Sequence, residues 1–229
     1  LTPGTYDNIV VPPGVLCLMQ ASAVQGNIQV LENAQLFAFN NDIRGNIEGD
    51  KAETMQLLNN TIGGNIQIKE GETPNNEGFD VFLCNNILTN GNIQVEKMKG
   101  SIIIGDAEPA VAFACQPNQL QNGNIKVEEN RIVPFPGFPT SGLVIRNNDV
   151  AANVQVFKNR NAPPKTVQGN FVGQNLQCFL CGRTEFRGQG RRPVLLACGH
   201  VPVIEPVPKG PVSHSARSAL RVDADRAAR

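Results

Sequence analysis

The sequence lacks tryptophan, has one tyrosine and two histidines, and contains no long run of apolar residues. A helix that crosses a bilayer needs about 20 consecutive apolar residues, so a membrane span is excluded. The 20 basic and 20 acidic side chains cancel, which argues against a dedicated nucleic-acid binder. Hydrophobic residues make up 41% of the 229 residues, enough to bury the core of one large domain or two small ones.

Charge and asparagine content divide the chain near Gly182. Residues 1–181 hold 11 basic and 16 acidic side chains, a balance of −5, and all 26 asparagines. Residues 182–229 hold nine basic and four acidic side chains, a balance of +5, and no asparagine. We therefore predict a repeat domain over residues 1–181 and a basic tail rich in Arg, Pro and Ala over residues 182–229. The tail either packs on the domain or is partly disordered.

The tripeptide Gly-Asn-Ile recurs through the first region. Full copies begin at Gly26, Gly45, Gly64, Gly91 and Gly123, and degenerate copies contain Asn8, Asn153 and Asn175. The marker asparagines are 19 residues apart in the first copies and 22 to 32 apart in the later ones. A repeat of this length indicates a solenoid of stacked units.

Each unit has the pattern of short strands. Apolar and polar residues alternate at residues 28–30 and 66–68, which is typical of β-structure. A second marker is an Asn pair, as at residues 40–41 and 59–60. Asn suits corners because it tolerates left-handed backbone, and stacked Asn side chains can bond to their copies above and below. These features predict an all-β fold, a single-stranded, right-handed parallel β-helix of about eight turns with an irregular C-terminal tail.

Three segments carry the likeness to a known group of proteins. They are residues 10–18 (Val-Val-Pro-Pro-Gly-Val-Leu-Cys-Leu), the repeated Gly-Asn-Ile-Gln, and residues 175–178 (Asn-Leu-Gln-Cys). Residues 1–181 thereby resemble secreted parallel β-helix proteins that have no agreed activity. The resemblance implies the architecture and a secreted or cell-surface location, and it implies no reaction.

Some polysaccharide-degrading enzymes also use parallel β-helices. Their chemistry needs clustered carboxylates, or Arg and Lys beside an acidic calcium site. The repeats contain no His and no Asp-Asp pair. We therefore expect a non-catalytic structural or interaction module, with no catalytic residue and no cofactor. A carbohydrate-binding or polysaccharide-degrading protein is the alternative, and it rests on fold analogy.

Three expansions of the repeat are the best functional candidates. They cover residues 70–78, 97–109 and 131–142. Each is predicted to lie between the Gly-Asn-Ile strand and the second strand of the unit, which precedes the Asn pair. Such insertions emerge side by side on one face of a solenoid. The third holds Arg131, Phe135 and Phe138, which are candidates for binding an extracellular glycan or protein. Alternatively, the two Phe rings fold back over the strands.

Alignment of the second strands on their Asn pairs separates two sets of apolar side chains. The inward set is Leu36, Ala38, Met55, Leu57, Val81, Leu83, Leu143 and Ile145. The outward set is Phe37, Phe39, Leu58, Phe82 and Val144. Monomeric proteins normally cover an apolar patch of this kind. We expect residues 193–197 and 201–204 of the tail to cover it, or another copy of the protein through self-association.

Six cysteines fit an extracellular chain better than a cytosolic one. Cys84 and Cys115 occupy corresponding stretches of neighbouring units, so they are the preferred disulfide pair. The alternative is two free buried thiols. The sequence Cys178-x-x-Cys181 with Cys198 and His200 loosely matches a zinc site. The rest of such a pattern is missing, so we favour a disulfide there and predict no metal.

Overall fold

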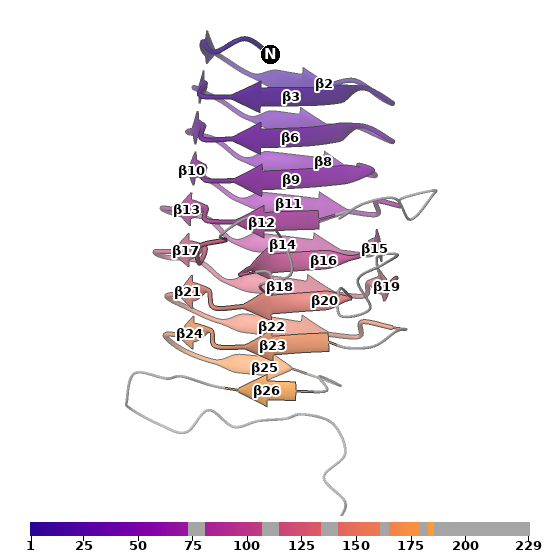
Figure 1. Ribbon diagram of the computed structural model, residues 1–229, viewed down its shortest axis with the longest axis vertical. Helices are drawn as coiled ribbons and strands as arrows, with labels where there is room; N and C mark the ends of the chain where they lie inside the picture. The colour runs from indigo at the N-terminus through magenta and orange to yellow at the C-terminus, as the bar shows by residue number, and fades with distance from the viewer. Residues whose placement is uncertain (73–80, 107–114, 134–141, 161–164, 179–182, 186–229) are drawn as a thin grey trace, which may run out of the picture. The chain divides into compact units, whose positions relative to one another are not determined.

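The computed structural model of the protein describes residues 1–72, 81–106, 115–133, 142–160, 165–178 and 183–185. All regular secondary structure in these ranges is β-strand. The chain coils so that each turn adds one strand to each of three parallel sheets (Figure 1). The fold is therefore a parallel β-helix with eight strands in each sheet, as the repeats predict.

The three sheets are named here in the order in which the chain meets them. Sheet 1 contains β1 (Thr5–Tyr6), β4 (Ala23–Val24), β7 (Asp42–Ile43), β10 (Thr61–Ile62), β13 (Ile87–Leu88), β17 (Gln119–Leu120), β21 (Asp149–Val150) and β24 (Phe171–Val172). Sheet 2 contains β2 (Ile9–Val11), β5 (Ile28–Val30), β8 (Ile47–Asp50), β11 (Ile66–Lys69), β14 (Ile93–Glu96), β18 (Ile125–Glu128), β22 (Val154–Phe157) and β25 (Leu176–Cys178). Sheet 3 contains β3 (Leu16–Gln20), β6 (Gln35–Phe39), β9 (Thr54–Leu58), β12 (Val81–Cys84), β16 (Ile102–Gly105), β20 (Leu143–Arg146), β23 (Lys165–Gln168) and β26 (Arg183–Glu185).

The coil is right-handed. In Figure 1 the chain runs to the left along sheet 3, which lies nearer the viewer, and passes through sheet 1 at the left edge. It then returns to the right along the more distant sheet 2 while it descends. This is the hand that crossovers between parallel strands almost always take. Strand β26 extends sheet 3 past residue 181, whereas the predicted boundary at Gly182 and the tail from residue 186 lie outside the described residues.

Alternation along the strands places the core inside the coil. The isoleucines of the Gly-Asn-Ile copies begin the strands of sheet 2 and pair in register, as Ile47 does with Ile66. All eight side chains predicted to point inward from the second strands are buried, with at most 1% exposure. Together with the inward residues of sheets 1 and 2 they form one continuous core.

Buried asparagines join sheets 3 and 1 at every turn after the first, where Ser22 takes the position. This buried Asn ladder consists of Asn41, Asn60, Asn86, Asn118, Asn148 and Asn170. The Asn60 Nδ2 donates to the Asn86 Oδ1 at 3.0 Å and to the Ala38 carbonyl at 3.0 Å. The first Asn of each pair has a left-handed backbone, with φ of 56° at Asn40 and 59° at Asn59. The hydrogen-bonded stack and the left-handed corner are the two roles that the Asn pairs predict.

The second expansion does not leave the coil where the sequence predicts. Residues 102–105 form β16, which pairs with β12 and β20 inside sheet 3. The insertion in this turn therefore follows sheet 3, whereas residues 73–80 and 134–141 lie between a strand of sheet 2 and one of sheet 3. The prediction of three loops at one corner is wrong. The strand was missed because Asp106 and Ala107 follow it in the sequence, where four other turns have an Asn pair.

Candidate functional site

The outer face of sheet 2 presents a column of polar side chains, here called the Gln column after its commonest residue. Its members are Gln29, Glu48, Gln67, Gln94, Lys126, Gln155 and Gln177, which pair in register from turn to turn. Each lies between two buried residues of its strand, so the alternation points it outward. The repeated Ile-Gln of the sequence is the signal for this column.

A second row of amides, here called the exposed Asn ladder, runs along the edge of sheet 2. It consists of Asn8, Asn27, Asn46, Asn65, Asn92, Asn124, Asn153 and Asn175. The Asn65 backbone N–H donates to the Asn46 Oδ1 at 2.8 Å, and the Asn65 Nδ2 donates to the same oxygen at 3.2 Å. A primary amide has two N–H donors, so a rung such as Asn65 keeps one donor for a group outside the ladder.

The exposed Asn ladder and the Gln column enclose a shallow groove of about 240 Å³. Side chains of Asn46, Glu48, Asn65, Gln67, Asn92 and Gln94 line it. The Gln67 Nε2 donates to the Gln94 Oε1 at 3.4 Å. Neutral amides both donate and accept, so this groove, the amide groove, can pair with hydroxyl groups without a charge on the ligand. Sequence analysis missed it because no single repeat contains it.

Three charged side chains meet next to this groove. Glu96 and Glu128 pair in register on adjacent strands, and the Lys126 Nζ bonds to both carboxylates, at 3.2 Å to Glu96. Burial raises the pKa of Glu96, but hydrogen bonds from Gln94 and Lys126 outweigh it, so the pKa lies below its usual value. The hydrogen bond to Glu128 raises the pKa of Lys126. An ionised Glu96 suits a structural ion pair rather than a proton donor, which needs a raised pKa.

Arg131 lies at the corner between sheets 2 and 3. It begins β19 (Arg131–Ile132), which pairs with β15 (Lys99–Gly100) in a separate two-stranded sheet. The Arg131 side chain is exposed, while Ile132 points into the core. Phe135 and Phe138, its predicted partners in binding, lie outside the described residues.

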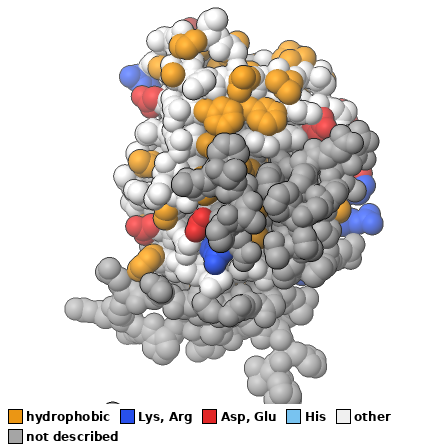
Figure 2. All heavy atoms as spheres, viewed as in Figure 1, with side chains coloured by type: hydrophobic (Ala, Val, Ile, Leu, Met, Phe, Trp, Pro, Cys, Tyr) orange, Lys and Arg blue, Asp and Glu red, His pale blue; other side chains and the backbone are white. Residues whose placement is uncertain are grey.

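The outward apolar set divides into a partly exposed group, here called the open apolar patch, and a buried group. Phe37, Phe39 and Leu58 are partly exposed, and Figure 2 shows hydrophobic side chains gathered over β3 and β6. Phe82 and Val144 are only 3% and 6% exposed. They point away from the core, as predicted, and the segments expected to cover them, residues 193–197 and 201–204, lie outside the described residues. They pack in a second apolar cluster with Ile103, Cys84 and Cys115.

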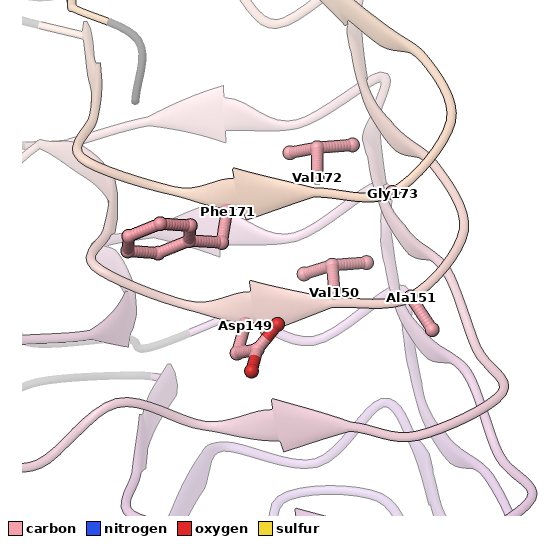
Figure 3. Close-up of a pocket in the computed structure, with 6 residues that line it drawn as sticks. All are labelled: Asp149, Val150, Ala151, Phe171, Val172 and Gly173. Carbon is pink, nitrogen blue, oxygen red and sulfur yellow. The ribbon is translucent and has the colours of Figure 1, made fainter. Parts of the chain in front are cut away.

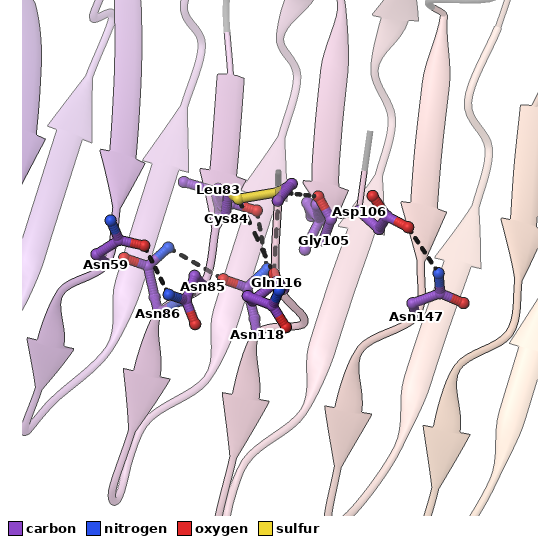
Figure 4. Close-up of a disulfide and its surroundings, with 12 residues drawn as sticks. Asn59, Leu83, Cys84, Asn85, Asn86, Gly105, Asp106, Gln116, Asn118 and Asn147 are labelled. Carbon is purple, nitrogen blue, oxygen red and sulfur yellow. Dashed lines mark hydrogen bonds between the residues drawn. A yellow bond between two sulfur atoms is a disulfide. The ribbon is translucent and has the colours of Figure 1, made fainter. Parts of the chain in front are cut away.

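A disulfide joins Cys84 and Cys115 across this second cluster (Figure 4). The two Cα atoms are 5.7 Å apart, and the pairing is the one that their positions in neighbouring turns favour. The Cys115 Sγ also lies 2.9 Å from the Gly105 carbonyl oxygen. Residue 115 is thereby held against the outer face of sheet 3. Cys178 is disulfide-bonded as well, whereas Cys181, Cys198 and His200 lie outside the described residues.

A small hollow of about 260 Å³ lies over sheet 1. Phe171 and Asp149 lie side by side on β24 and β21 (Figure 3), and Phe171 is 42% exposed. A ring beside a carboxylate can contact both an apolar and a hydroxyl-bearing surface. No sequence pattern predicts this hollow, because the strands of sheet 1 are only two residues long.

In comparisons with known proteins, no family model, no curated protein and no solved structure matches the chain. Among the described residues, no group of three or more His, Cys, Asp or Glu could hold a metal ion. The described part of the chain also contains no helix of the length and apolarity that crossing a membrane requires. The fold and the surfaces above therefore define a parallel β-solenoid with an amide groove.

Proposed function

We propose that the protein is a non-catalytic, secreted or cell-surface interaction module. The amide groove on sheet 2 is the observation that carries this proposal. Its Gln67 side chain stands on a strand that is paired on both sides, and hydrogen bonds of the exposed Asn ladder hold its asparagines, so these groups keep fixed positions. Preorganised polar groups bind a ligand at little entropic cost.

The extracellular location is supported by the cysteines. The Cys84–Cys115 disulfide and the disulfide-bonded Cys178 suit an oxidising compartment. The likeness of residues 1–181 to secreted parallel β-helix proteins agrees with this location. The non-catalytic role is supported by Glu96, since a carboxylate whose pKa is lowered is a poor general acid.

A glycan is the partner class that suits the groove best. Sugar hydroxyls donate and accept hydrogen bonds, and the groove offers amides that do the same. Residues 70–78 and 131–142, most of which lie outside the described residues, are a second glycan-binding candidate, whereas 97–109 no longer belongs with them because it contains β16.

A glycan-array screen of the oxidised protein tests the proposal. The variant Gln67→Ala/Gln94→Ala removes two side chains of the groove, and Gln177→Ala is the matched control in the same column but beyond the groove. We expect the double variant to lose at least tenfold in affinity, while the control binds like the unmodified protein. No binding to any glycan, or equal binding by all three proteins, would overturn the assignment of the groove.

Self-association is a second candidate, favoured by the open apolar patch. Leu18 is 51% exposed and pairs in register with Phe37, so the apolar surface continues from β6 onto β3. Large exposed apolar patches mark interaction sites. A second copy of the protein is the simplest partner for such a surface.

A further inference from the structure

Three cationic residues occupy equivalent positions at the corner between sheets 2 and 3. Lys99 pairs in register with Arg131, and Arg131 pairs with Arg160 in the next turn. The Arg131 N–H donates to the Met98 carbonyl at 2.8 Å, and the Arg160 N–H donates to the Asn130 carbonyl at 2.7 Å. Adjacent strands lie about 4.8 Å apart, so the three side chains start one turn apart along the coil.

Three lysines at this corner have carboxylate partners, whereas Lys165 donates to the Asn159 carbonyl. Lys97 bonds to Glu70 at 3.3 Å, Lys158 bonds to Glu129 at 2.9 Å, and Lys99 bonds to Glu72. Neither Arg131 nor Arg160 has an ion pair with a described residue, and both are exposed. Two positive charges thus lie side by side without a described neutralising partner.

The neighbouring sequence supplies no carboxylate either. Residues 134–141, which follow Arg131, read Pro-Phe-Pro-Gly-Phe-Pro-Thr-Ser, and residues 161–164, which follow Arg160, read Asn-Ala-Pro-Pro. Like charges placed directly opposite each other on paired strands destabilise a sheet. A pair of this kind is typical of functional surfaces, where a local rule of stability is broken for a ligand.

We infer that Arg131 and Arg160 form an anion-binding site for an acidic polysaccharide. Guanidinium groups bind carboxylate and sulfate through two parallel hydrogen bonds. The column of Lys99, Arg131 and Arg160 runs along the coil axis. The ligand that fits it therefore carries anionic groups at regular intervals along a chain.

A nucleic acid is the less favoured polyanion. Residues 1–181 carry a net charge of −5, which opposes the approach of a densely charged phosphate backbone. An acidic polysaccharide has a lower charge density and adds hydroxyls. The site is separate from the amide groove, so it does not depend on the function proposed for that groove.

The test measures binding of polygalacturonate, dextran sulfate, neutral dextran and single-stranded DNA to the full chain by calorimetry. The variants are Arg131→Gln, Arg160→Gln and the double substitution. Arg44→Gln is the matched control, because Arg44 is exposed at a different corner of the coil, between sheets 1 and 2. Thermal unfolding of each variant checks that it folds.

We expect one or both acidic polysaccharides to bind, neutral dextran not to bind, and affinity to fall as salt increases. Loss of one charge-assisted contact should weaken binding about tenfold, and the double variant should lose measurable binding. Without ligand, Arg160→Gln should raise Tm slightly at low salt, since it removes a repulsion. Comparison of polygalacturonate with dextran sulfate shows whether the site prefers carboxylate or sulfate.

Three outcomes would overturn the inference: no binding of either acidic polymer, equal binding by the double variant and the Arg44→Gln control, or tighter binding of DNA than of both polysaccharides. Gln67→Ala/Gln94→Ala is included as well. If that variant keeps its affinity for the acidic polymer while the arginine variants lose it, the anion site stands even if the amide groove binds no glycan.

Discussion

The side chain of Asn60 donates to the Oδ1 of Asn86 at 3.0 Å, one turn further along the coil. Both asparagines are buried, with at most 1% exposure. Asn86 in turn donates to the Leu57 carbonyl at 2.8 Å and to the Asn118 Oδ1 at 3.0 Å. Each rung therefore satisfies polar groups in two neighbouring turns, and no buried side-chain polar atom among the described residues lacks a partner.

Replacing an asparagine should lower the free energy of unfolding more in the buried Asn ladder than in the exposed Asn ladder. Asn86→Ala removes the buried acceptor of the Asn60 backbone N–H and the side-chain donor to the Leu57 carbonyl, so we expect a loss of about 3 kcal/mol in the free energy of unfolding. Asn92→Ala in the exposed ladder should cost about 1 kcal/mol, because water replaces the lost bonds. Urea unfolding followed by circular dichroism measures both. Equal losses would contradict the role assigned to burial.

Gly91 should tolerate no side chain, because the neighbouring turn lies against it. A Cβ at Gly91 would lie 1.7 Å from the Gly64 carbonyl oxygen, so Gly91→Ala must push two turns apart. Gly14 has a left-handed φ of 69° and open space around it, so Gly14→Ala should cost only about 1 to 2 kcal/mol. We expect Gly91→Ala to unfold at a much lower urea concentration. A smaller effect at Gly91 than at Gly14 would refute the close packing.

Removal of the Cys84–Cys115 disulfide should destabilise the coil and uncover its second apolar cluster. The cystine closes a loop with a sequence separation of 31, for which chain entropy predicts a loss of about 3.5 kcal/mol. Because Cys115 packs against Phe82 and Val144, Cys84→Ser/Cys115→Ser should also bind more of a hydrophobic dye. A Cys17→Ser variant is the control, since Cys17 is a free cysteine. Unchanged dye binding would show that residue 115 does not need the disulfide to stay in place.

The Glu96–Lys126–Glu128 cluster should make stability depend on acid pH. The pKa of Glu96 is lower in the folded chain than its ordinary value of 4.5, so ionised Glu96 stabilises the fold above that value. This stabilisation is lost as pH falls from 4.5 through the lowered folded-state pKa. In Lys126→Gln the loss between pH 5 and pH 3 should be smaller, as urea unfolding at several pH values would reveal. An identical pH profile in the variant would exclude Lys126 as the cause.

Self-association through the open apolar patch should depend on Phe37 and Phe39. We expect Phe37→Ser/Phe39→Ser to shift sedimentation toward the monomer at protein concentrations where the unmodified chain forms larger species. Phe171→Ser is the matched control, because Phe171 is an exposed ring on sheet 1. A monomer at all concentrations before substitution would eliminate this patch as a self-association surface.

The repeated markers explain why the fold could be predicted. Gly-Asn-Ile fixes the start of sheet 2 in each turn, and the Asn pairs fix the corner after sheet 3, so alternation assigns the inward residues correctly. Where a marker is absent the prediction fails. Residues 102–105 end in Gly105, and the ladder position of that turn is taken by Asn118 after an insertion. No local pattern links these two positions.

The candidate site was harder to predict because it is made of residues from different turns. Glu96, Lys126 and Glu128 are unremarkable within their own units, yet register brings them together. Aligning the units on Gly-Asn-Ile would have found this cluster and the Gln column. The burial of Phe82 and Val144 could not be found in that way, since it depends on Ile103 and Cys115, and neither lies in a unit with a regular pattern.

The two Asn ladders run in opposite senses along the coil. In the buried ladder Asn60 donates to Asn86, in the later turn, whereas in the exposed ladder Asn92 donates to Asn65, in the earlier turn. Each row of aligned amides carries an electric dipole, as the peptide groups of a helix do. Because the rows oppose each other, their dipoles offset. A coil of this kind can therefore gain turns with little build-up of opposite partial charge from these two ladders at its ends.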